Sequence, residues 1–175
     1  MQKGLIHIYC GEGKGKTTTS MGLAVRAAGY GMKVLIYQFM KNNQTSERKI
    51  LNSISNITII DGLDEEKFSF QMTDKEKKNH KEFYTNKFRE ITTKATQEKY
   101  DMIVMDEIIY TIRAGLLDEE LVFEFLGSKP ASLEVVLTGN APSDKLIEIA
   151  DYVSEIKKVK HPFDHGQVAR FGIEK

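Results

Sequence analysis

The chain has 175 residues with 25 basic and 25 acidic side chains, so its net charge is zero. A chain of this length buries about 70% of its unfolded surface in one domain, and we expect a single domain over residues 1–175. The balanced charge gives no reason to expect binding to nucleic acid or to a membrane surface, and no apolar run approaches the roughly 18 residues of a spanning helix. One cysteine forms no intrachain disulfide and the first residues lack a secretory signal pattern, so we expect a cytoplasmic protein.

Short apolar runs alternate with helical patterns along the chain, which is typical of βαβ units and a parallel sheet. The expected strands are residues 5–10, 33–39, 57–60, 102–106, 134–138 and 152–159. Several of these runs are apolar on both faces, as buried central strands are. We therefore predict an α/β fold of the P-loop NTPase-like, RecA-type class, with a mainly parallel sheet and helices on both faces.

Two helices are readily placed from their apolar spacing. Residues 16–29 carry apolar side chains at helical intervals, and Gly29 and Gly31 favour a helix end. Residues 73–97 form one apolar stripe within an otherwise charged segment, which predicts a long surface helix rather than an interaction arm. The stripe contains Tyr84, Phe88, Ile91 and Ala95.

A glycine-rich segment follows the first expected strand and precedes the first expected helix. It reads Gly11, Glu12, Gly13, Lys14, Gly15, Lys16, Thr17 and Thr18. Backbone N–H groups in such a loop can converge on phosphate oxygens, with the positive end of a helix dipole behind them. A lysine in this place can reach the phosphates, and the following hydroxyl can bind Mg²⁺. The segment therefore predicts a nucleotide site.

This loop is shorter than the usual phosphate-binding pattern, which has four residues between its first glycine and the Gly-Lys pair. Cys10 stands where that first glycine is expected. The phosphates could thus be held in a different pose, and we interpret Cys10 itself as a buried strand-end residue.

Two acidic residues, Asp106 and Glu107, follow the apolar run at residues 102–105. An acid at this position can cap a helix or bind a metal. The presence of the phosphate loop favours the metal site over the helix cap. We expect this site to combine Thr17, Asp106 and Glu107. Which acid binds Mg²⁺ directly and which acts through water stays open at this point.

These segments together resemble the corrinoid adenosyltransferases of the cob(I)yrinic acid a,c-diamide adenosyltransferase family. The resemblance rests on the short loop at residues 11–18, on Arg26, on the Gln38-Phe39 pair and on the Asp106-Glu107 pair. It continues through residues 137–142, 150–151, 159–164 and 172–173, and so covers nearly the whole chain.

The resemblance implies that ATP reacts at its 5′ carbon with a cobalt(I) corrinoid and that the whole triphosphate leaves. Lys16, Thr17 and Glu107 would then stabilise the leaving triphosphate together with Mg²⁺. It also implies a homodimer and a reducing partner such as a flavoprotein.

The resemblance further implies that two aromatic side chains lie against the corrinoid. Phe68 and Phe70 occupy the matching place, with Phe70 where the family has tryptophan. The two rings project to the same side if this stretch is extended, although alternate core packing would give the same pattern. Two other departures are the missing arginine after Gly139 and the absence of the helical extension that many bacterial members carry before the first strand, from which we expect looser access.

Several further residues are candidates for ligand contact. Arg26 and Lys14 are candidates for contact with ATP, whereas an exposed helix arginine without a role is the alternative for Arg26. Gln38 and Lys41 follow a parallel strand at its carboxyl end, where such sheets bind ligands.

Two other functions remain open from the residues. An ATP-dependent kinase or phosphohydrolase would use the same loop and carboxylates for transfer of the γ-phosphoryl group. A guanine-nucleotide switch normally has an Asn-Lys-x-Asp element, and residues 138–143 do not supply one.

Overall fold

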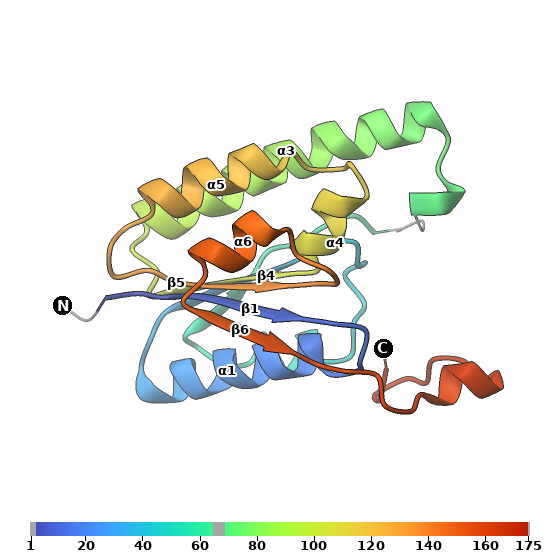
Figure 1. The fold of residues 1–175 in the computed structure, drawn as a ribbon. Helices are drawn as coiled ribbons and strands as arrows, with labels where there is room; N and C mark the ends of the chain where they lie inside the picture. The colour runs from blue at the N-terminus through green and yellow to red at the C-terminus, as the bar shows by residue number, and fades with distance from the viewer. Residues whose placement is uncertain (1–2, 65–68, 175) are drawn as a thin grey trace.

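The computed structural model describes residues 3–64 and 69–174 (Figure 1). Six strands form one sheet in the order β3-β2-β4-β5-β1-β6, and every neighbouring pair is parallel. The strands are β1 (Ile6–Cys10), β2 (Val34–Gln38), β3 (Ile57–Ile59), β4 (Met102–Asp106), β5 (Glu134–Thr138) and β6 (Tyr152–Glu155). The strand that ends at the phosphate loop and the strand that ends at Asp106 are thus separated by β5.

Helices cover both faces of this sheet (Figure 1). The α-helices are α1 (Lys16–Tyr30), α2 (Arg48–Leu51), α3 (Asp74–Gln97), α4 (Ile108–Arg113), α5 (Glu119–Ser128) and α6 (Asp144–Ile149). Two 3₁₀ turns, η1 (Ser69–Gln71) and η2 (Pro162–His165), precede α3 and follow β6. None of the helices in the described residues is both long and apolar enough to cross a membrane.

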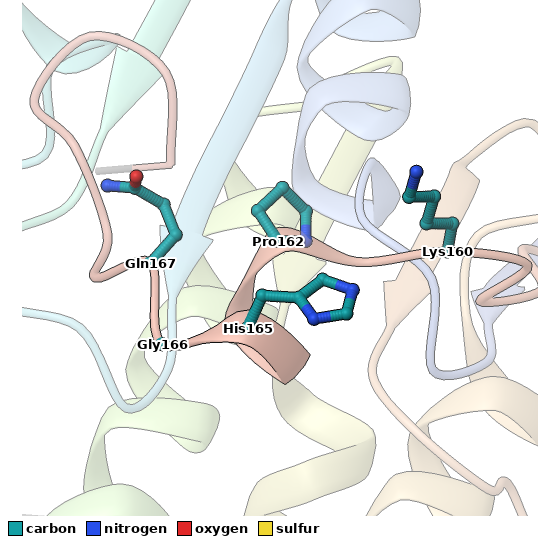
Figure 2. A pocket seen from close by; sticks show the side chains of 5 residues that line it. All are labelled: Lys160, Pro162, His165, Gly166 and Gln167. Carbon is teal, nitrogen blue, oxygen red and sulfur yellow. The ribbon is translucent and has the colours of Figure 1, made fainter.

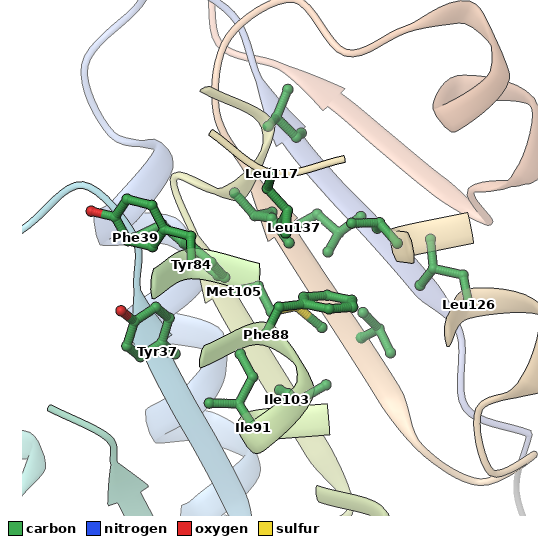
Figure 3. Close-up of a cluster of buried hydrophobic side chains, with 14 of the residues drawn as sticks. Tyr37, Phe39, Tyr84, Phe88, Ile91, Ile103, Met105, Leu117, Leu126 and Leu137 are labelled. Carbon is green, nitrogen blue, oxygen red and sulfur yellow. The ribbon is translucent and has the colours of Figure 1, made fainter. Parts of the chain in front are cut away.

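Two hydrophobic clusters lie on the two sides of the sheet. The larger cluster packs α3, α4, α5 and α6 against one face, and its centre includes Tyr84, Phe88 and Ile103 (Figure 3). The smaller cluster packs α1 against the other face through small side chains such as Ala24 and Ala28. Because both faces are covered, β2 and β4 are buried along their whole length.

The predicted α/β class, with a parallel sheet and helices on both faces, is confirmed. The six expected strands are present, with ends that differ by one or two residues at most places. The last strand is the exception, because β6 ends at Glu155 and its four residues are all exposed at the edge of the sheet. The long helix is also confirmed, and it begins after Thr73, whose hydroxyl forms a capping box with Glu76.

Candidate active site

The phosphate loop connects β1 to α1 and passes directly beside the backbone of Ile156. The Gly13 N–H donates a hydrogen bond of 2.7 Å to the Ile156 carbonyl oxygen. A Cβ atom on Gly11 would lie 2.5 Å from that oxygen, and one on Gly13 would lie 2.7 Å from it. Gly15, which precedes α1, has a φ of 125°, a conformation that side chains rarely tolerate. The glycines therefore let the loop follow the chain after β6 and enter the helix.

The ammonium group of Lys16 lies over this loop. It donates hydrogen bonds of 2.7 Å to the Gly11 carbonyl oxygen and 3.0 Å to the Gly13 carbonyl oxygen. Carbonyl oxygens are neutral acceptors, and a phosphate is a stronger partner for an ammonium group because the hydrogen bond is then charge-assisted on both sides. Lys16 is thus held where an incoming phosphate can replace these carbonyls.

The carboxylate of Asp106, at the end of β4, is the centre of a polar network. Its side chain is fully buried. The Thr17 hydroxyl lies 3.0 and 3.1 Å from its two oxygens, and the Thr138 hydroxyl donates to Oδ1 at 2.7 Å. Gln38 Nε2 lies 3.4 Å from Oδ2. Such a buried charge is stable only where donors and a cation surround it.

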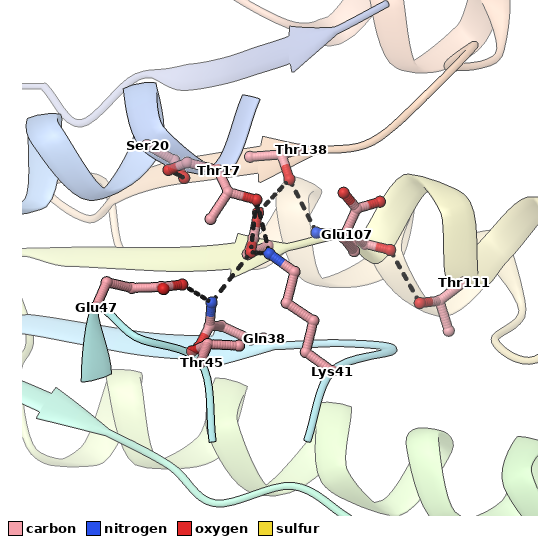
Figure 4. A network of polar contacts seen from close by, with 10 residues as sticks. Thr17, Ser20, Gln38, Lys41, Thr45, Glu47, Glu107, Thr111 and Thr138 are labelled. Carbon is pink, nitrogen blue, oxygen red and sulfur yellow. Dashed lines mark hydrogen bonds and ion pairs between the residues drawn. The ribbon is translucent and has the colours of Figure 1, made fainter. Parts of the chain in front are cut away.

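The cation is the ammonium group of Lys41, which reaches in from the loop after β2 (Figure 4). It lies 2.6 Å from Asp106 Oδ2 and 2.7 Å from Thr17 Oγ1. The preceding Met40 has a left-handed backbone with a φ of 54°, and its N–H donates to the Tyr84 hydroxyl at 3.3 Å. The loop backbone therefore turns Lys41 back toward the end of β4.

Glu107 takes a different position from its neighbour. Its backbone has a φ of 60° and its N–H donates to the Thr138 hydroxyl at 2.8 Å, which anchors the start of α4. Its carboxylate faces the cavity and makes no hydrogen bond or ion pair with the residues that the structure describes. Burial raises the pKa of this carboxyl, and the negative charge of Asp106 raises it further.

A cavity of about 370 Å³ lies between the phosphate loop and the C-terminal segment. Loop residues 12–18 line it, together with Lys41 from the loop after β2 and Glu107 from the end of β4. The segment after β6 supplies the remaining wall through His161, Pro162, Phe163, Gln167, Val168, Ala169, Ile173 and Glu174. The Gly172 N–H donates to the Ser46 hydroxyl at 3.3 Å, so this segment crosses to the loop after β2. A second, open hollow of about 560 Å³ lies on the C-terminal segment alone, beside His165 (Figure 2).

Magnesium fits the residues around Asp106. Among the described residues, no three His, Cys, Asp or Glu side chains cluster as a metal site. Mg²⁺ nevertheless needs only one or two carboxylates when waters and substrate phosphates complete its six oxygen ligands. Thr17 and Asp106 already share one cation, the Lys41 ammonium group, and Glu107 faces the same cavity. The donor set is therefore suited to a divalent cation that arrives with phosphate.

The predicted site residues do not all meet in one place. The loop residues at 12–18, together with Lys41, Asp106 and Glu107, surround the cavity or the polar network behind it. Gln38 does not line the cavity. Its amide nitrogen donates to Glu47 at 2.7 Å and its amide oxygen accepts from Thr45 at 3.0 Å. Arg26 is exposed on α1 and does not line the cavity. Burial raises the pKa of the Tyr9 phenol, and the positive charge of Arg26 partly offsets this rise.

The predicted aromatic pair is described only in part. Phe68 lies outside the described residues. Phe70 lies in the 3₁₀ turn η1. Residues 69–71 are therefore not extended, and the condition under which the two rings would project to the same side is not met there. The Phe70 side chain is 76% exposed, which excludes core packing for this ring. Next to it, the Ser69 and Tyr110 hydroxyl groups lie 2.9 Å apart, which ties the turn to α4.

Two features of the site were missed by the sequence reasoning. Thr138 received no role, although its place at the carboxyl end of a parallel strand is where ligands and their supporting groups gather. The C-terminal wall was also missed, because His161 and its neighbours carry no ligand spacing. Their position depends on the passage of Ile156 beside the loop, which no local pattern indicates.

The close approach of loop and C-terminal segment can be tested with Gly13→Ala. The new Cβ would lie 2.7 Å from the Ile156 oxygen and 2.8 Å from the Lys157 oxygen, so the loop or the segment must move. We expect ATP affinity, measured by calorimetry, to fall by about tenfold or more, about 1.4 kcal/mol. Gly22→Ala on α1 is the matched control, since nothing lies within 4 Å of its added Cβ. Equal ATP affinity of the Gly13 variant and the wild type would contradict the account.

The raised pKa of Glu107 predicts how Glu107→Gln changes stability. A carboxyl group whose pKa is higher in the folded state destabilises that state once it ionises. The nucleotide-free variant should therefore melt above the wild type at pH 7 to 8, by the order of 2–4 °C for each kcal/mol removed. The difference should shrink as the pH falls through the folded pKa of Glu107 and vanish below its unfolded value. A difference that stays the same down to pH 4, measured by scanning calorimetry, would show another cause.

Comparison with known proteins identifies the family of this chain. The family described as ATP:corrinoid adenosyltransferase BtuR/CobO/CobP matches residues 2–174. A protein named corrinoid adenosyltransferase from Escherichia coli K12 is 33% identical over 178 residues, which cover 99% of this chain and 86% of that protein. Corrinoid adenosyltransferase CobA of Salmonella typhimurium LT2 is 30% identical over 186 residues, with 99% and 86% covered.

Among solved structures, a KaiC-like protein of Pyrococcus horikoshii is similar with a TM-score of 0.47 and 16% identity. The similarity covers 99% of this chain and 69% of that one. The family match over residues 2–174 and the two relatives decide the assignment: the chain belongs to the ATP:corrinoid adenosyltransferase family BtuR/CobO/CobP.

Proposed function

We propose that this chain transfers the 5′-deoxyadenosyl group of ATP to the cobalt(I) of a corrinoid, either cobalamin or a precursor, and releases triphosphate. The observation that carries the proposal is the cavity in which the phosphate loop faces Lys41 and Glu107, within a chain of this family. The cavity offers a triphosphate backbone and hydroxyl donors and three lysine side chains, Lys14, Lys16 and Lys41, in one place.

The reaction is a displacement at the 5′ carbon of ATP. The cobalt(I) electron pair forms the cobalt–carbon bond, the C5′–O5′ bond breaks, and its electron pair leaves on the triphosphate. The loop N–H groups and the Lys16 ammonium group stabilise the negative charge that develops on this leaving group. Thr17, Asp106 and Glu107 would hold Mg²⁺, which would supply further positive charge there. Cobalt(I) carries no proton, so its attack on the 5′ carbon needs no general base.

The corrinoid is proposed to lie near η1 and α4. Phe70 is an exposed aromatic ring, and the contact of Ser69 with Tyr110 ties its turn to the helix that begins after Glu107. An exposed ring at this place is suited to contact the flat face of a macrocycle. Phe68 is proposed to act with it.

Further components follow from the same proposal. A reductant, such as a flavoprotein, must supply the electrons that produce cobalt(I). We also propose that the protein works in the cytoplasm, and that it forms a homodimer, as the family resemblance implies.

The function is tested with Mg·ATP and chemically reduced cobalamin under anaerobic conditions. We expect the visible spectrum of a light-sensitive adenosylated corrinoid to appear in step with inorganic triphosphate. The formation of ADP and phosphate with an unchanged corrinoid would contradict the proposal and favour a kinase or phosphohydrolase.

Phe70→Ala tests the place of the corrinoid. Loss of the ring should weaken corrinoid binding by about tenfold, about 1.4 kcal/mol, and leave ATP affinity within about twofold. Tyr30→Ala removes another largely exposed aromatic ring, at the C-terminal end of α1, and serves as the control. The measurement is a titration of each variant with cobalamin and with ATP. Unchanged corrinoid affinity in the Phe70 variant would remove this ring from the site.

A further inference from the structure

The ammonium group of Lys41 lies where a divalent cation would bind. It is within 2.6 Å of Asp106 Oδ2 and 2.7 Å of Thr17 Oγ1, and these two oxygens belong to the proposed magnesium site. A cation with two oxygen ligands at Mg²⁺ distances, about 2.1 Å, would need the space in which this nitrogen lies. The ammonium group and the metal ion therefore compete for one position.

The surrounding backbone holds Lys41 in this position. The Phe39 N–H donates to the Asp106 carbonyl oxygen at 2.8 Å, which fixes the end of β2 against β4. Met40 then adopts a left-handed conformation that an L residue seldom takes, with its N–H on the Tyr84 hydroxyl. Beyond Lys41, Asn43 is hydrogen-bonded to the backbone of Gly62 through both its amide oxygen and its amide nitrogen. The loop is thus anchored on both sides of the lysine.

The lysine side chain also has a second direction open to it. It is about one quarter exposed and lines the cavity that the phosphate loop faces. A flexible ammonium group that leaves Asp106 can reach an anion in that cavity without any change in the backbone. A bound triphosphate is such an anion.

We propose that Lys41 is a built-in substitute for the metal ion, which keeps Mg²⁺ out of the nucleotide-free site and exchanges with it when triphosphate binds. Without triphosphate, a divalent ion would have to displace the ammonium group from Asp106 and Thr17, and the other carboxylate close enough to feel its charge is Glu107. With triphosphate, the ammonium group moves onto a phosphate and the metal takes its place on Thr17 and Asp106. This inference rests on the part of the proposed function that places Mg-triphosphate at the loop.

The exchange makes metal and triphosphate binding depend on each other. If triphosphate raises metal affinity, the metal must raise triphosphate affinity by the same factor. The protein would then bind the metal–nucleotide complex as a unit. Free Mg²⁺ alone would not displace Lys41 from the buried Asp106.

The test measures the binding of Mn²⁺, an oxygen-preferring stand-in for Mg²⁺, by electron paramagnetic resonance without nucleotide. Lys41→Met removes the competing ammonium group, and we expect Mn²⁺ affinity to rise by about tenfold or more. Lys41→Gln is prepared beside it, because its amide can still donate to Asp106 and preserve folding. Lys14→Met is the matched control, since Lys14 lines the same cavity without touching Thr17 or Asp106.

The outcomes separate competition for a position from a general effect of charge. The exchange is supported if Mn²⁺ affinity rises by about tenfold or more in the Lys41 variants and changes by less than about threefold in Lys14→Met. Equal gains in both, or no gain in a folded Lys41 variant, overturns it. The wild type provides a check without any variant, because micromolar Mn²⁺ affinity without triphosphate would show that Lys41 does not exclude the metal.

The same titration with inorganic triphosphate needs no adenosyl transfer. If the exchange is observed and no adenosylated corrinoid forms, the proposed function fails and the role of Lys41 stands. If adenosylation occurs and the Mn²⁺ affinities of wild type and variants are equal, the function stands and the exchange fails.

Discussion

The buried carboxylate of Asp106 is the contact on which the arrangement of the site depends. It joins three segments that are distant in sequence: α1 through Thr17, the end of β2 and its following loop through Gln38 and Lys41, and β5 through Thr138. A buried negative charge is costly unless all its oxygens are satisfied and a cation lies close. The strand order β2-β4-β5 meets this requirement, because it brings the ends of the neighbouring strands to both sides of Asp106.

A second constraint shapes the other wall of the cavity. The chain after β6 passes so close to the loop that Gly11 and Gly13 have no space for a Cβ atom. The same passage places the C-terminal segment over the loop, with apolar side chains such as Phe163 and Ile173 at the cavity. The loop glycines thus admit the covering segment, and the Gly13 N–H is hydrogen-bonded to it.

Much of the fold and part of the site could be predicted from local patterns. Apolar runs predicted the parallel sheet, and the short loop predicted Lys16 and Thr17, because each of these signals lies within a few neighbouring residues. The partnership of Asp106 with Lys41 and Thr138 could not be predicted, since it depends on strand order and on the left-handed turn at Met40. The expected extension of β6 to residue 159 was wrong for a similar reason. Beyond Glu155, the chain leaves the sheet edge to follow the loop.

In the proposed exchange, Lys41 and a divalent cation occupy the oxygens of Thr17 and Asp106 in turn. A crystal structure with Mg²⁺ and a nonreactive ATP analogue would show which of the two is bound. We expect the metal on the Thr17 hydroxyl and the Lys41 ammonium group within hydrogen-bond distance of a phosphate oxygen. A structure in which Lys41 remains on Asp106 while the metal binds elsewhere would contradict it.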